Sequence, residues 1–570
     1  MNIRPLNPFY LYATLWRGGG CARKSALVVI GVMTGLAAGT VRAADPKAAE
    51  APVAQGEPSA QRADAQEAAP RFNVRQIRVR GAKTLDASVI ESAIYPYLGK
   101  GRTTDDLEAA RAALEKAYKD KGHQTVAVEI PQQSGTRGII YMDVVENRVG
   151  RLRVHGAKWF SADKIKKGAP SLAEGTIPDF KAVEKDIIAL NGWPDRRVTP
   201  VLRPGIEPGT VDVDLNVEDK MPLHGSIELN NRYSPDTTEL RLNGAVNYNN
   251  LWQLGHSLGL AAQIAPQRLE DAEVYSGYYI ARFAQAPDFS LMFMGTKQNS
   301  DVSTLGGSVV AGRGEILGVR TMFSLPRRGN YFHSLGFGLD YKSFDENITL
   351  ADSVMATPID YYPITLEYGG GWTGENYFTE FNASVNFHLR GLGSKPEGFD
   401  AKRYDSDGSY LFFRGDLSHT QDLPAGFEGF AKAQVQLSND PLVNSEQFSG
   451  GGLSSVRGYL ESEALGDSGW FLTAELRTPS LFQHMGAEIE GQDPEQEWRW
   501  HVFIDGGQLF VNDILPGQED SYNLASIGLG SRLMLWNHLN GSFDLAWPLI
   551  DQAYTKAGDA FLSFRLWADF

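Results

Sequence analysis

Apolar and polar side chains alternate with a period of two from Leu223 to the C-terminus at Phe570. Such alternation is typical of β-strands that have one apolar and one polar face. The segments are about ten residues long, which is the length of a strand in a membrane-spanning barrel. We count sixteen of them, an even number, as expected for a bacterial barrel made from one chain. They cover residues 223–232, 240–249, 257–267, 275–284, 289–301, 315–326, 332–346, 358–370, 376–391, 409–423, 427–439, 468–479, 498–510, 522–536, 539–549 and 559–570.

The last segment indicates which of its faces meets lipid. The apolar face carries Leu562, Phe564, Leu566, Ala568 and Phe570. The polar face carries Ser563, Arg565 and Asp569, with Trp567 as an exception that suits a membrane rim. A soluble β-sandwich or a solenoid is the alternative, and the apolar faces and the terminal aromatic residue disfavour it. We therefore expect an all-β membrane protein with a 16-stranded transmembrane β-barrel over residues 221–570.

A different pattern, in which strands and helices mix, precedes the barrel and contains an internal repeat. The segment Val74–Lys83 recurs as Val149–Lys158, and both copies share the core Arg-Val-x-Gly-Ala-Lys. A repeat of about 75 residues indicates two copies of one small domain. We place these copies at residues 71–147 and 148–219. Two unrelated modules are the alternative, which the shared core disfavours.

Each copy is expected to have the element order β-α-α-β-β. An alternating strand opens each copy, and apolar residues at helical spacing follow it. The first copy has helical segments at 86–97 and 104–121 and closing strands at 125–130 and 138–145. The second copy has a helical segment at 181–190 and closing strands at 197–202 and 210–217. Two α+β domains are therefore expected ahead of the barrel.

The N-terminus predicts export from the cytoplasm. Basic residues precede an apolar run from Ala26 to Gly39, and Val41-Arg42-Ala43 offers small residues for cleavage. This order is typical of a secretory signal peptide, which we place at residues 1–43. The apolar run of about 14 residues is too short for a helix across about 30 Å of hydrocarbon. Residues 44–70 are rich in Ala, Glu, Gln and Pro and predict a linker, in which a short helix remains an alternative.

Composition and short motifs exclude several classes of function. The formal net charge of −15 argues against a protein that binds nucleic acid. Cys21 is the only cysteine and lies in the expected signal peptide, so the mature chain has neither a disulfide nor a thiolate metal site. The sequence contains no His-Glu-x-x-His string and no Gly-x-x-x-x-Gly-Lys-Ser/Thr string. We expect no metal, no cofactor and no nucleotide-driven step.

One long connection between barrel strands carries a candidate functional motif. About 28 residues separate the strands at 427–439 and 468–479, and connections of this length are usually functional or disordered. The connection contains Val456-Arg457-Gly458-Tyr459, with a glycine for a tight path and an aromatic residue close to the arginine. A disordered loop would seldom carry such a string.

The strand parity places two carboxylates inside the barrel. In the segment 498–510 the apolar residues take one face, so Asp505 faces the lumen. The same parity places Glu475 inside on the neighbouring strand. A loop that folds inward would let Arg457 form a bidentate pair with Asp505 or Glu475. A solvated loop arginine is the alternative, and spacing alone favours that alternative.

The combination of motifs resembles one known family. Val456-Arg457-Gly458-Tyr459, Phe503-Ile504-Asp505-Gly506-Gly507 and the paired α+β domains are similar to those of the two-partner secretion transporters, the TpsB family of haemolysin and filamentous haemagglutinin secretion. This family lies within the superfamily of outer-membrane assembly barrels. The resemblance covers residues from about 71 to 570.

The resemblance implies a location, a partner and a role for the motif residues. It implies periplasmic POTRA domains at 71–219, a barrel in the bacterial outer membrane, and a sixth extracellular loop that folds into the pore. In the family the loop arginine pairs with the aspartate of the lumen-facing strand, and we carry these roles to Arg457 and Asp505. The expected partner is an unfolded, β-rich exoprotein with an N-terminal secretion domain. The resemblance also implies a monomer surrounded by outer-membrane lipid, without enzymatic activity. The family's pore-plugging helix cannot be assigned to 44–70.

Three other functions are alternatives to secretion. An assembly factor that inserts other barrels usually has more POTRA domains than two. A passive porin or receptor leaves the repeat at 74 and 149 without a purpose. Gly255-His256-Ser257-Leu258-Gly259 fits the Gly-x-Ser-x-Gly motif of serine hydrolases, but that motif needs a strand, a sharp turn and a helix. Here Ser257 runs directly into the segment 257–267, so we expect no hydrolase.

Overall fold

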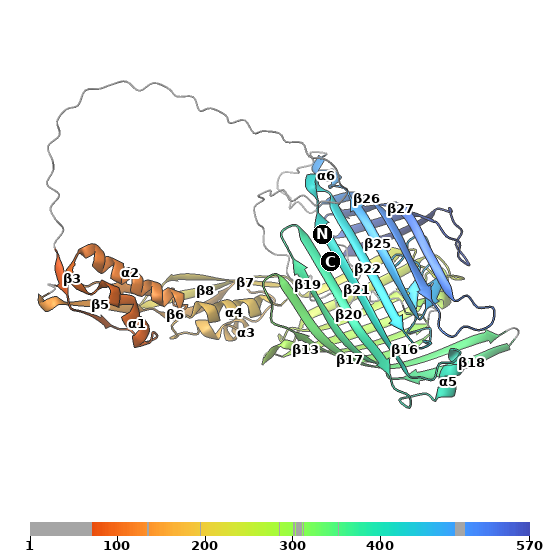
Figure 1. Cartoon of the computed structure of the whole chain (residues 1–570), viewed down its shortest axis with the longest axis horizontal. Helices are drawn as coiled ribbons and strands as arrows, with labels where there is room; N and C mark the ends of the chain where they lie inside the picture. The colour runs from red at the N-terminus through yellow and green to blue at the C-terminus, as the bar shows by residue number, and fades with distance from the viewer. Residues whose placement is uncertain are drawn as a thin grey trace, which may run out of the picture.

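An elongated α+β arm leads into a closed β-barrel (Figure 1). The computed structural model describes residues 71–133, 136–193, 195–283, 285–299, 302–303, 310–311, 313–350, 353–484 and 496–570. The expected signal peptide (1–43) and linker (44–70) lie outside the described residues. Within these ranges no helix combines the length and the apolar character that crossing a membrane requires.

The first α+β unit folds around a three-stranded sheet. Its elements are β1 (Phe72–Val74), β2 (Gln76–Arg80), α1 (Ala87–Ile94), β3 (Gly99–Arg102), α2 (Thr104–Asp120), β4 (Val126–Glu129) and β5 (Ile139–Glu146). The central strand β5 runs parallel to β2 and antiparallel to β4. The side chains of Thr103 and Asp106 form a capping box that starts α2. The expected apolar stripe of this helix, from Leu107 to Tyr118, is buried against the sheet.

The second unit repeats the same sheet topology. Its elements are β6 (Arg148–His155), α3 (Ala162–Lys167), α4 (Phe180–Asn191), β7 (Arg196–Pro204) and β8 (Thr210–Asp219). The strand β8 is central, parallel to β6 and antiparallel to β7. The sequence pattern located only one of the two helices expected in this copy, because α3 is six residues long and shows too little periodicity.

The repeated Gly-Ala-Lys segment makes the same turn in both units. Gly81 has φ +86° and Gly156 has φ +85°, in the left-handed region that glycine favours. A carboxylate closes each turn. Glu146 Oε1 accepts the backbone N–H of Lys83 at 2.7 Å, and Asp219 Oδ2 accepts that of Lys158 at 2.8 Å. The sequence repeat is therefore a repeat of a specific hydrogen-bonded turn.

The barrel closes through antiparallel pairing of its first and last strands, β9 and β29. Its strands are β9 (Leu223–Asn230), β10 (Arg241–Leu251), β11 (His256–Ile264), β12 (Glu273–Phe283), β13 (Ala286–Asn299), β16 (Gly314–Ser324), β17 (Tyr331–Leu350), β18 (Ser353–Tyr361), β19 (Ile364–Thr373), β20 (Tyr377–His388), β21 (Tyr410–Asp422), β22 (Glu428–Ser438), β25 (Ser468–Arg477), β26 (Glu497–Phe510), β27 (Ser521–Leu535), β28 (Leu539–Pro548) and β29 (Phe561–Asp569). β18 and β19 share one position in the wall, so the barrel has the expected 16 strands.

One predicted strand is interrupted. The segment 358–370 was expected to be continuous, but β18 ends at Tyr361 and β19 starts at Ile364. Pro363 lies in the break, because proline has no N–H to donate to a ladder. Its carbonyl still accepts the N–H of Asp340 at 3.1 Å. The long strand β17 pairs with β18 along its second half and with β19 along its first half.

Several short strands and helices lie in the loops between the barrel strands. They are β14 (Val302–Ser303) with β15 (Val310–Ala311), α5 (Pro396–Lys402), β23 (Phe448–Gly450) with β24 (Ala464–Gly466), and α6 (Leu481–His484). The helix α5 packs on β18, and both extend beyond the barrel wall in Figure 1.

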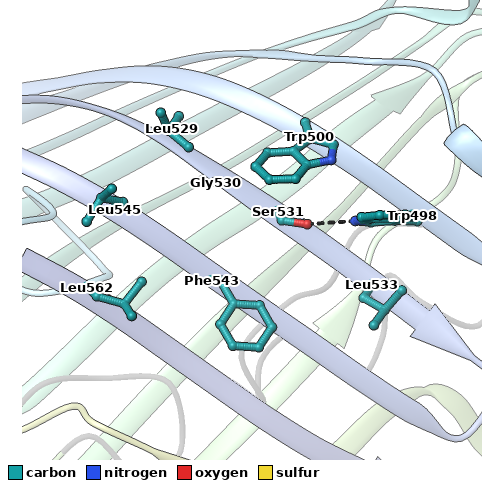
Figure 2. A pocket seen from close by; sticks show the side chains of 9 residues that line it. All are labelled: Trp498, Trp500, Leu529, Gly530, Ser531, Leu533, Phe543, Leu545 and Leu562. Carbon is teal, nitrogen blue, oxygen red and sulfur yellow. Dashed lines mark hydrogen bonds between the residues drawn. The ribbon is translucent and has the colours of Figure 1, made fainter.

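The two faces of the wall follow the predicted parity. On the outer face, Ile504 is 56% exposed and Leu562 is 52% exposed, whereas the lumen residues Asp505 and Ser563 are buried. A hollow of about 380 Å³ lies on the outer face of β26 to β29, and Figure 2 shows the residues that line it. Large apolar side chains surround Ser531 there, and the Trp498 indole donates to the Ser531 hydroxyl at 3.0 Å. The hollow therefore belongs to the lipid-facing surface and not to the lumen.

The arm is fixed to the barrel through the turn between β10 and β11. The side chain of Gln253 accepts the N–H of Ser161 at 2.9 Å and donates to the carbonyl of Trp159 at 2.9 Å. On the other side of the joint, His224 of β9 lies 2.8 Å from Asp195. These contacts hold the second α+β unit at the opening of the barrel.

Candidate functional site: a loop latched inside the barrel

The loop between β22 and β25, residues 439–467, folds back into the barrel. Asp467 joins the base of the loop to its surroundings. Its Oδ1 accepts the N–H of Leu442 at 2.8 Å, and its Oδ2 accepts the N–H of Asn512 at 2.7 Å. The Arg403 guanidinium also donates to Oδ2 at 3.1 Å. The base of the loop is therefore a fixed structure.

Arg457 lies at the inner end of this loop and contacts the barrel wall. Its side chain is 5% exposed. Nε donates to Asp505 Oδ2 at 2.7 Å and Nη2 donates to Oδ1 at 2.8 Å, which is a bidentate pair. The backbone N–H of Arg457 also donates to Asp505 Oδ2 at 3.1 Å. Nη1 donates to Glu475 Oε1 at 2.6 Å. The structure therefore brings Arg457 to both carboxylates that strand parity placed inside.

An aromatic ring supports the guanidinium. Arg457 Cζ lies 3.5 Å from the centroid of the Phe503 ring, within the range of a cation–π contact. The Phe503 ring in turn lies over Gly528 of β27. A Cβ at Gly528 would be 2.2 Å from Phe503 Cζ. The missing side chain of Gly528 thus gives the ring its place.

Further charges on the wall extend the network beyond the pair. Asp544 of β28 lies 3.5 Å from Arg457 Nη1. It also accepts from Arg532 at 2.8 Å and lies 2.7 Å from His501 Nε2. Glu475 has a second partner in Arg477, whose Nη2 is 2.7 Å away. Buried cations and carboxylates alternate here, which offsets much of the cost of removing them from water.

The residues beside Arg457 fix the tip by packing and hydrogen bonding. Val456 is fully buried in an apolar cluster with Phe448 and Phe471. Gly458 has φ +92°, and a Cβ there would lie 3.0 Å from the Cβ of Ala546. The Tyr459 hydroxyl lies within hydrogen-bond distance of two carbonyl oxygens, that of Ala525 at 3.0 Å and that of Ile550 at 2.8 Å. All four residues of the Val-Arg-Gly-Tyr string therefore contact the loop's own cluster or the wall.

The returning half of the loop has separate anchors. Glu461 accepts from Arg232 Nε at 2.6 Å and from Nη2 at 3.1 Å, just beyond the end of β9. The Glu463 carboxylate accepts the N–H of Thr555 at 2.8 Å. From β22, Lys432 Nζ donates to the carbonyl of Ser454 at 2.9 Å. The loop is thus held by strands on several sides of the barrel.

Of the two glycines of the predicted motif strand, only Gly507 has a packing role. A Cβ at Gly507 would be 2.2 Å from Phe471 Cδ1, so the absence of a side chain admits that ring. At Gly506 the nearest atom to a Cβ is 3.8 Å away, which is an ordinary contact. Sequence reasoning did not find Asp544 or Gly528, because the register between strands brings them to the site. It also did not find Glu461, because its partner Arg232 is 229 positions away in the sequence.

The Gly-x-Ser-x-Gly string has a structural explanation. The Ser257 hydroxyl is buried and accepts from Arg282 Nη1 at 2.9 Å, and the Gly255 carbonyl accepts from the same guanidinium. The adjacent His256 faces Tyr279, whose hydroxyl is 2.5 Å from Nδ1. Ser257 lies in β11 and not at a strand-to-helix turn. In the described part of the chain, no group of His, Cys, Asp or Glu has the arrangement of a metal site.

Comparisons with known proteins agree on one family. A family model described as haemolysin secretion/activation protein ShlB/FhaC/HecB matches residues 209–533. A second, described as POTRA domain, ShlB-type, matches residues 72–147. Curated relatives include the outer membrane transporter CdiB of Dickeya dadantii (strain 3937), 21% identical over 88% of this chain and 87% of the relative. The outer membrane transporter CdiB of Escherichia coli is 25% identical over 84% of this chain and 79% of the relative.

Solved structures share the fold. CdiB from Escherichia coli superposes with a TM-score of 0.61 at 20% identity, over 90% of this chain and 93% of that one. BamA from Haemophilus ducreyi, lacking POTRA domains 1–3, superposes with a TM-score of 0.53 at 15% identity, over 88% of this chain and 100% of that one. The family model spans more than half of the sequence and separates the two alternatives that share this barrel. The chain therefore belongs to the ShlB/FhaC/HecB family of haemolysin secretion/activation proteins, and it is an outer-membrane transporter of the two-partner secretion type with periplasmic POTRA domains.

Proposed function

We propose that this transporter exports one large, mostly β exoprotein and that the loop 439–467 sets the state of its pore. The exoprotein would carry an N-terminal secretion domain and reach the transporter unfolded. One copy of the chain, surrounded by outer-membrane lipid, would form the pore. No catalytic step on the cargo is part of this proposal.

The burial of Arg457 among carboxylates is the observation that supports a gating loop. A buried arginine stays in place only while carboxylates compensate for its lost hydration. Arg457 meets Asp505 and Glu475 on two neighbouring strands and approaches Asp544 on a third. The loop occupies space in the lumen through which an extended chain would pass. Export therefore requires the loop to shift, and the Arg457 contacts set the free energy of that shift.

The sheet edges of the arm support capture of an unfolded cargo. In the first unit the strand order β2-β5-β4 leaves β2 and β4 as edges, and in the second β6-β8-β7 leaves β6 and β7. An extended chain can add to such an edge through main-chain hydrogen bonds, with little demand on its sequence. The arm lies at the same end of the barrel as the start of β9, where His224 lies 2.8 Å from Asp195. A captured segment would thus be delivered to the barrel opening.

Folding of the cargo outside the cell is the proposed driving force. The sequence contains no nucleotide-binding string of the Gly-x-x-x-x-Gly-Lys-Ser/Thr type. A β-rich chain that folds after it leaves the pore cannot return, so each folded segment would favour export of the next.

Deletion of the gene tests the proposal. We expect one large protein to disappear from the culture medium and to be degraded in the periplasm, with other outer-membrane barrels at their normal abundance. Quantitative proteomics of medium, periplasm and outer membrane measures all three. A loss spread over many barrels would instead support an assembly factor.

A further inference from the structure

The turn between β16 and β17 has an unusual charge. It carries Arg327 and Arg328, which are both exposed. The barrel strands alternate in direction from β9, which starts at the arm, so this turn lies at the end of the barrel that bears the periplasmic arm. By sequence, the other connections between barrel strands at this end contain no lysine or arginine. In a chain with a formal net charge of −15, two adjacent cations at this place are a local exception.

An aromatic cluster lies directly beside this turn. The Tyr331 ring stacks on Trp372 of β19 at 4.8 Å between centroids and on His333 at 4.7 Å. The Tyr368 hydroxyl is 2.5 Å from the Tyr331 hydroxyl and 3.0 Å from His333 Nδ1. The polar atoms of the cluster are thus joined to one another and the ring faces pack together.

The cluster faces lipid. Strand parity places Tyr331 and His333 on the same side of β17 as Leu335 and Phe337, which are exposed on the outer wall. Trp372 pairs with Tyr331 across the two strands and is 41% exposed. Tryptophan and tyrosine concentrate where hydrocarbon meets headgroups. The cluster therefore marks the level of the periplasmic membrane interface.

The two arginines are held next to that interface. The backbones of Arg328 and Tyr331 exchange hydrogen bonds of 3.0 and 3.1 Å, which fixes Arg328 beside the aromatic cluster. The Arg327 Nε donates to the carbonyl of Gly329 at 2.9 Å, so its guanidinium also stays at the turn. A guanidinium presents several N–H donors in a plane and matches the oxygens of a phosphate.

The hollow of Figure 2 provides a contrast on the same surface. Trp498 and Trp500 also line the outer face, near the start of β26. The connection that precedes them, however, contains Glu488, Glu490 and Asp493 and has no lysine or arginine by sequence. Aromatic residues therefore occur at both places, whereas a cationic pair accompanies only the cluster at Trp372.

We propose that Arg327, Arg328 and the aromatic cluster of Tyr331, His333, Tyr368 and Trp372 form a binding site for an anionic phospholipid of the periplasmic leaflet. The guanidinium groups bind the headgroup phosphate, and the rings pack against the glycerol and the upper acyl chains. The site fixes the height of the β16–β20 wall in the bilayer, on strands distant in sequence from the latched loop. It depends on the membrane location of the barrel and not on the proposed gating.

Lipid retention on the purified full-length protein tests the site. The protein is reconstituted in nanodiscs that contain equal amounts of phosphatidylglycerol and phosphatidylcholine, released, and analysed by native mass spectrometry. We expect the wild type to retain phosphatidylglycerol in preference to phosphatidylcholine. Arg327→Gln/Arg328→Gln should lower phosphatidylglycerol retention by about fivefold for each arginine removed. Arg327→Lys/Arg328→Lys should keep most of it.

A charge-matched control separates the site from net charge. Lys116→Gln/Lys119→Gln removes two cations from α2 of the first α+β unit, where both side chains are exposed by 50% or more. This control should retain lipid like the wild type. Equal retention by the wild type and the double glutamine variant, or an equal loss in the control, would overturn the proposal. Heat-modifiable migration reports folding, and Arg328→Gln alone replaces the double variant if the latter fails to fold.

Discussion

Arg457 and Asp505 are joined by three hydrogen bonds, two from the guanidinium and one from the backbone N–H of the arginine. The residues are 48 positions apart, one in a loop and the other in the wall strand β26. Because both the side chain and the main chain of the loop contact one carboxylate, the position of the loop tip depends on Asp505. This relationship leads to the first prediction.

Arg457→Ala should impair secretion and leave a folded barrel in the membrane. The change leaves Asp505 without its main partner, at a cost of about 1–3 kcal/mol for a buried group. That cost changes the equilibrium constant for the position of the loop by one or two orders of magnitude. It does not unfold the barrel, whose stability comes from its strand ladder. Asp505→Ala should resemble Arg457→Ala, and the double variant should be no worse than either, because coupled residues are not additive.

Export into the medium, normalised to heat-modifiable barrel, measures this effect. Arg268→Ala is a suitable control, since Arg268 is another loop arginine that pairs with an aspartate, Asp271, but is 53% exposed. Its loss should leave secretion unchanged. Wild-type secretion in both Arg457→Ala and Asp505→Ala would show that the pair is a structural contact without a role in secretion.

Gly528→Ala should weaken the contacts of Arg457 with the barrel wall without changing a charged residue. The new Cβ would lie 2.2 Å from Phe503 Cζ and 2.5 Å from the carbonyl oxygen of Leu545, so the ring that supports the Arg457 guanidinium must move and the neighbouring strand β28 must shift. We expect a smaller loss of secretion than for Arg457→Ala. Proteolysis of loop 439–467 in intact cells measures the effect, and we expect it to be faster than in the wild type. Gly244→Ala in β10 is the matched control, because no atom lies within 4 Å of its Cβ position. Similar proteolysis of both variants would contradict a role for the ring.

The barrel wall was predictable because its signal is local. Alternation over about ten residues specifies which side chains face lipid, and this sufficed to place Asp505 and Glu475 inside. The break between Tyr361 and Ile364 also had a local signal in Pro363, which the counting of alternating positions overlooked. The short helix α3 had no comparable signal.

The composition of the site was less accessible from the sequence. Spacing alone favoured a solvated Arg457, and the inward path of the loop was inferred from the family resemblance. Asp544 and Gly528 join the site through the register of β26, β27 and β28, where Phe503 pairs with Gly528 and Gly528 with Ala546. Register depends on contacts between distant segments, which periodicity within one strand does not specify.

Ser257→Ala should leave secretion at the wild-type level. The hydroxyl accepts one hydrogen bond from Arg282, and the Gly255 carbonyl remains as a second acceptor for that guanidinium. Loss of one such bond costs about 1 kcal/mol, and β11 remains in place because its strand pairing is much stronger than that. Export of the cargo and hydrolysis of a chromogenic ester by purified protein are the two measurements. A loss of either one would reopen the hydrolase interpretation of the Gly-x-Ser-x-Gly string.

Glu146→Gln should destabilise the first α+β unit at neutral pH and have less effect in acid. Partial burial pushes the pKa of Glu146 upward, but hydrogen bonds from the backbones of Lys83 and Thr84 outweigh it and hold the pKa below its usual value. A carboxylate whose pKa is lowered by folding contributes stability above its unfolded pKa of about 4.3, and this stability is lost as the pH falls through the folded pKa. Replacement by the neutral amide should therefore cost about 1 kcal/mol at pH 7 and progressively less below pH 4.

Hydrogen exchange of peptides from β2 and β5, in the full-length protein, measures the effect of Glu146→Gln against the wild type at each pH. Glu108→Gln on the exposed face of α2 is the control and should match the wild type at every pH, because exposed ion pairs contribute little. The difference between wild type and Glu146→Gln should narrow as the pH is lowered, since protonation removes the same charge from the wild type. A difference that is constant from pH 7 to pH 3 would show that the amide disturbs packing, and that the charge of Glu146 does not stabilise the turn.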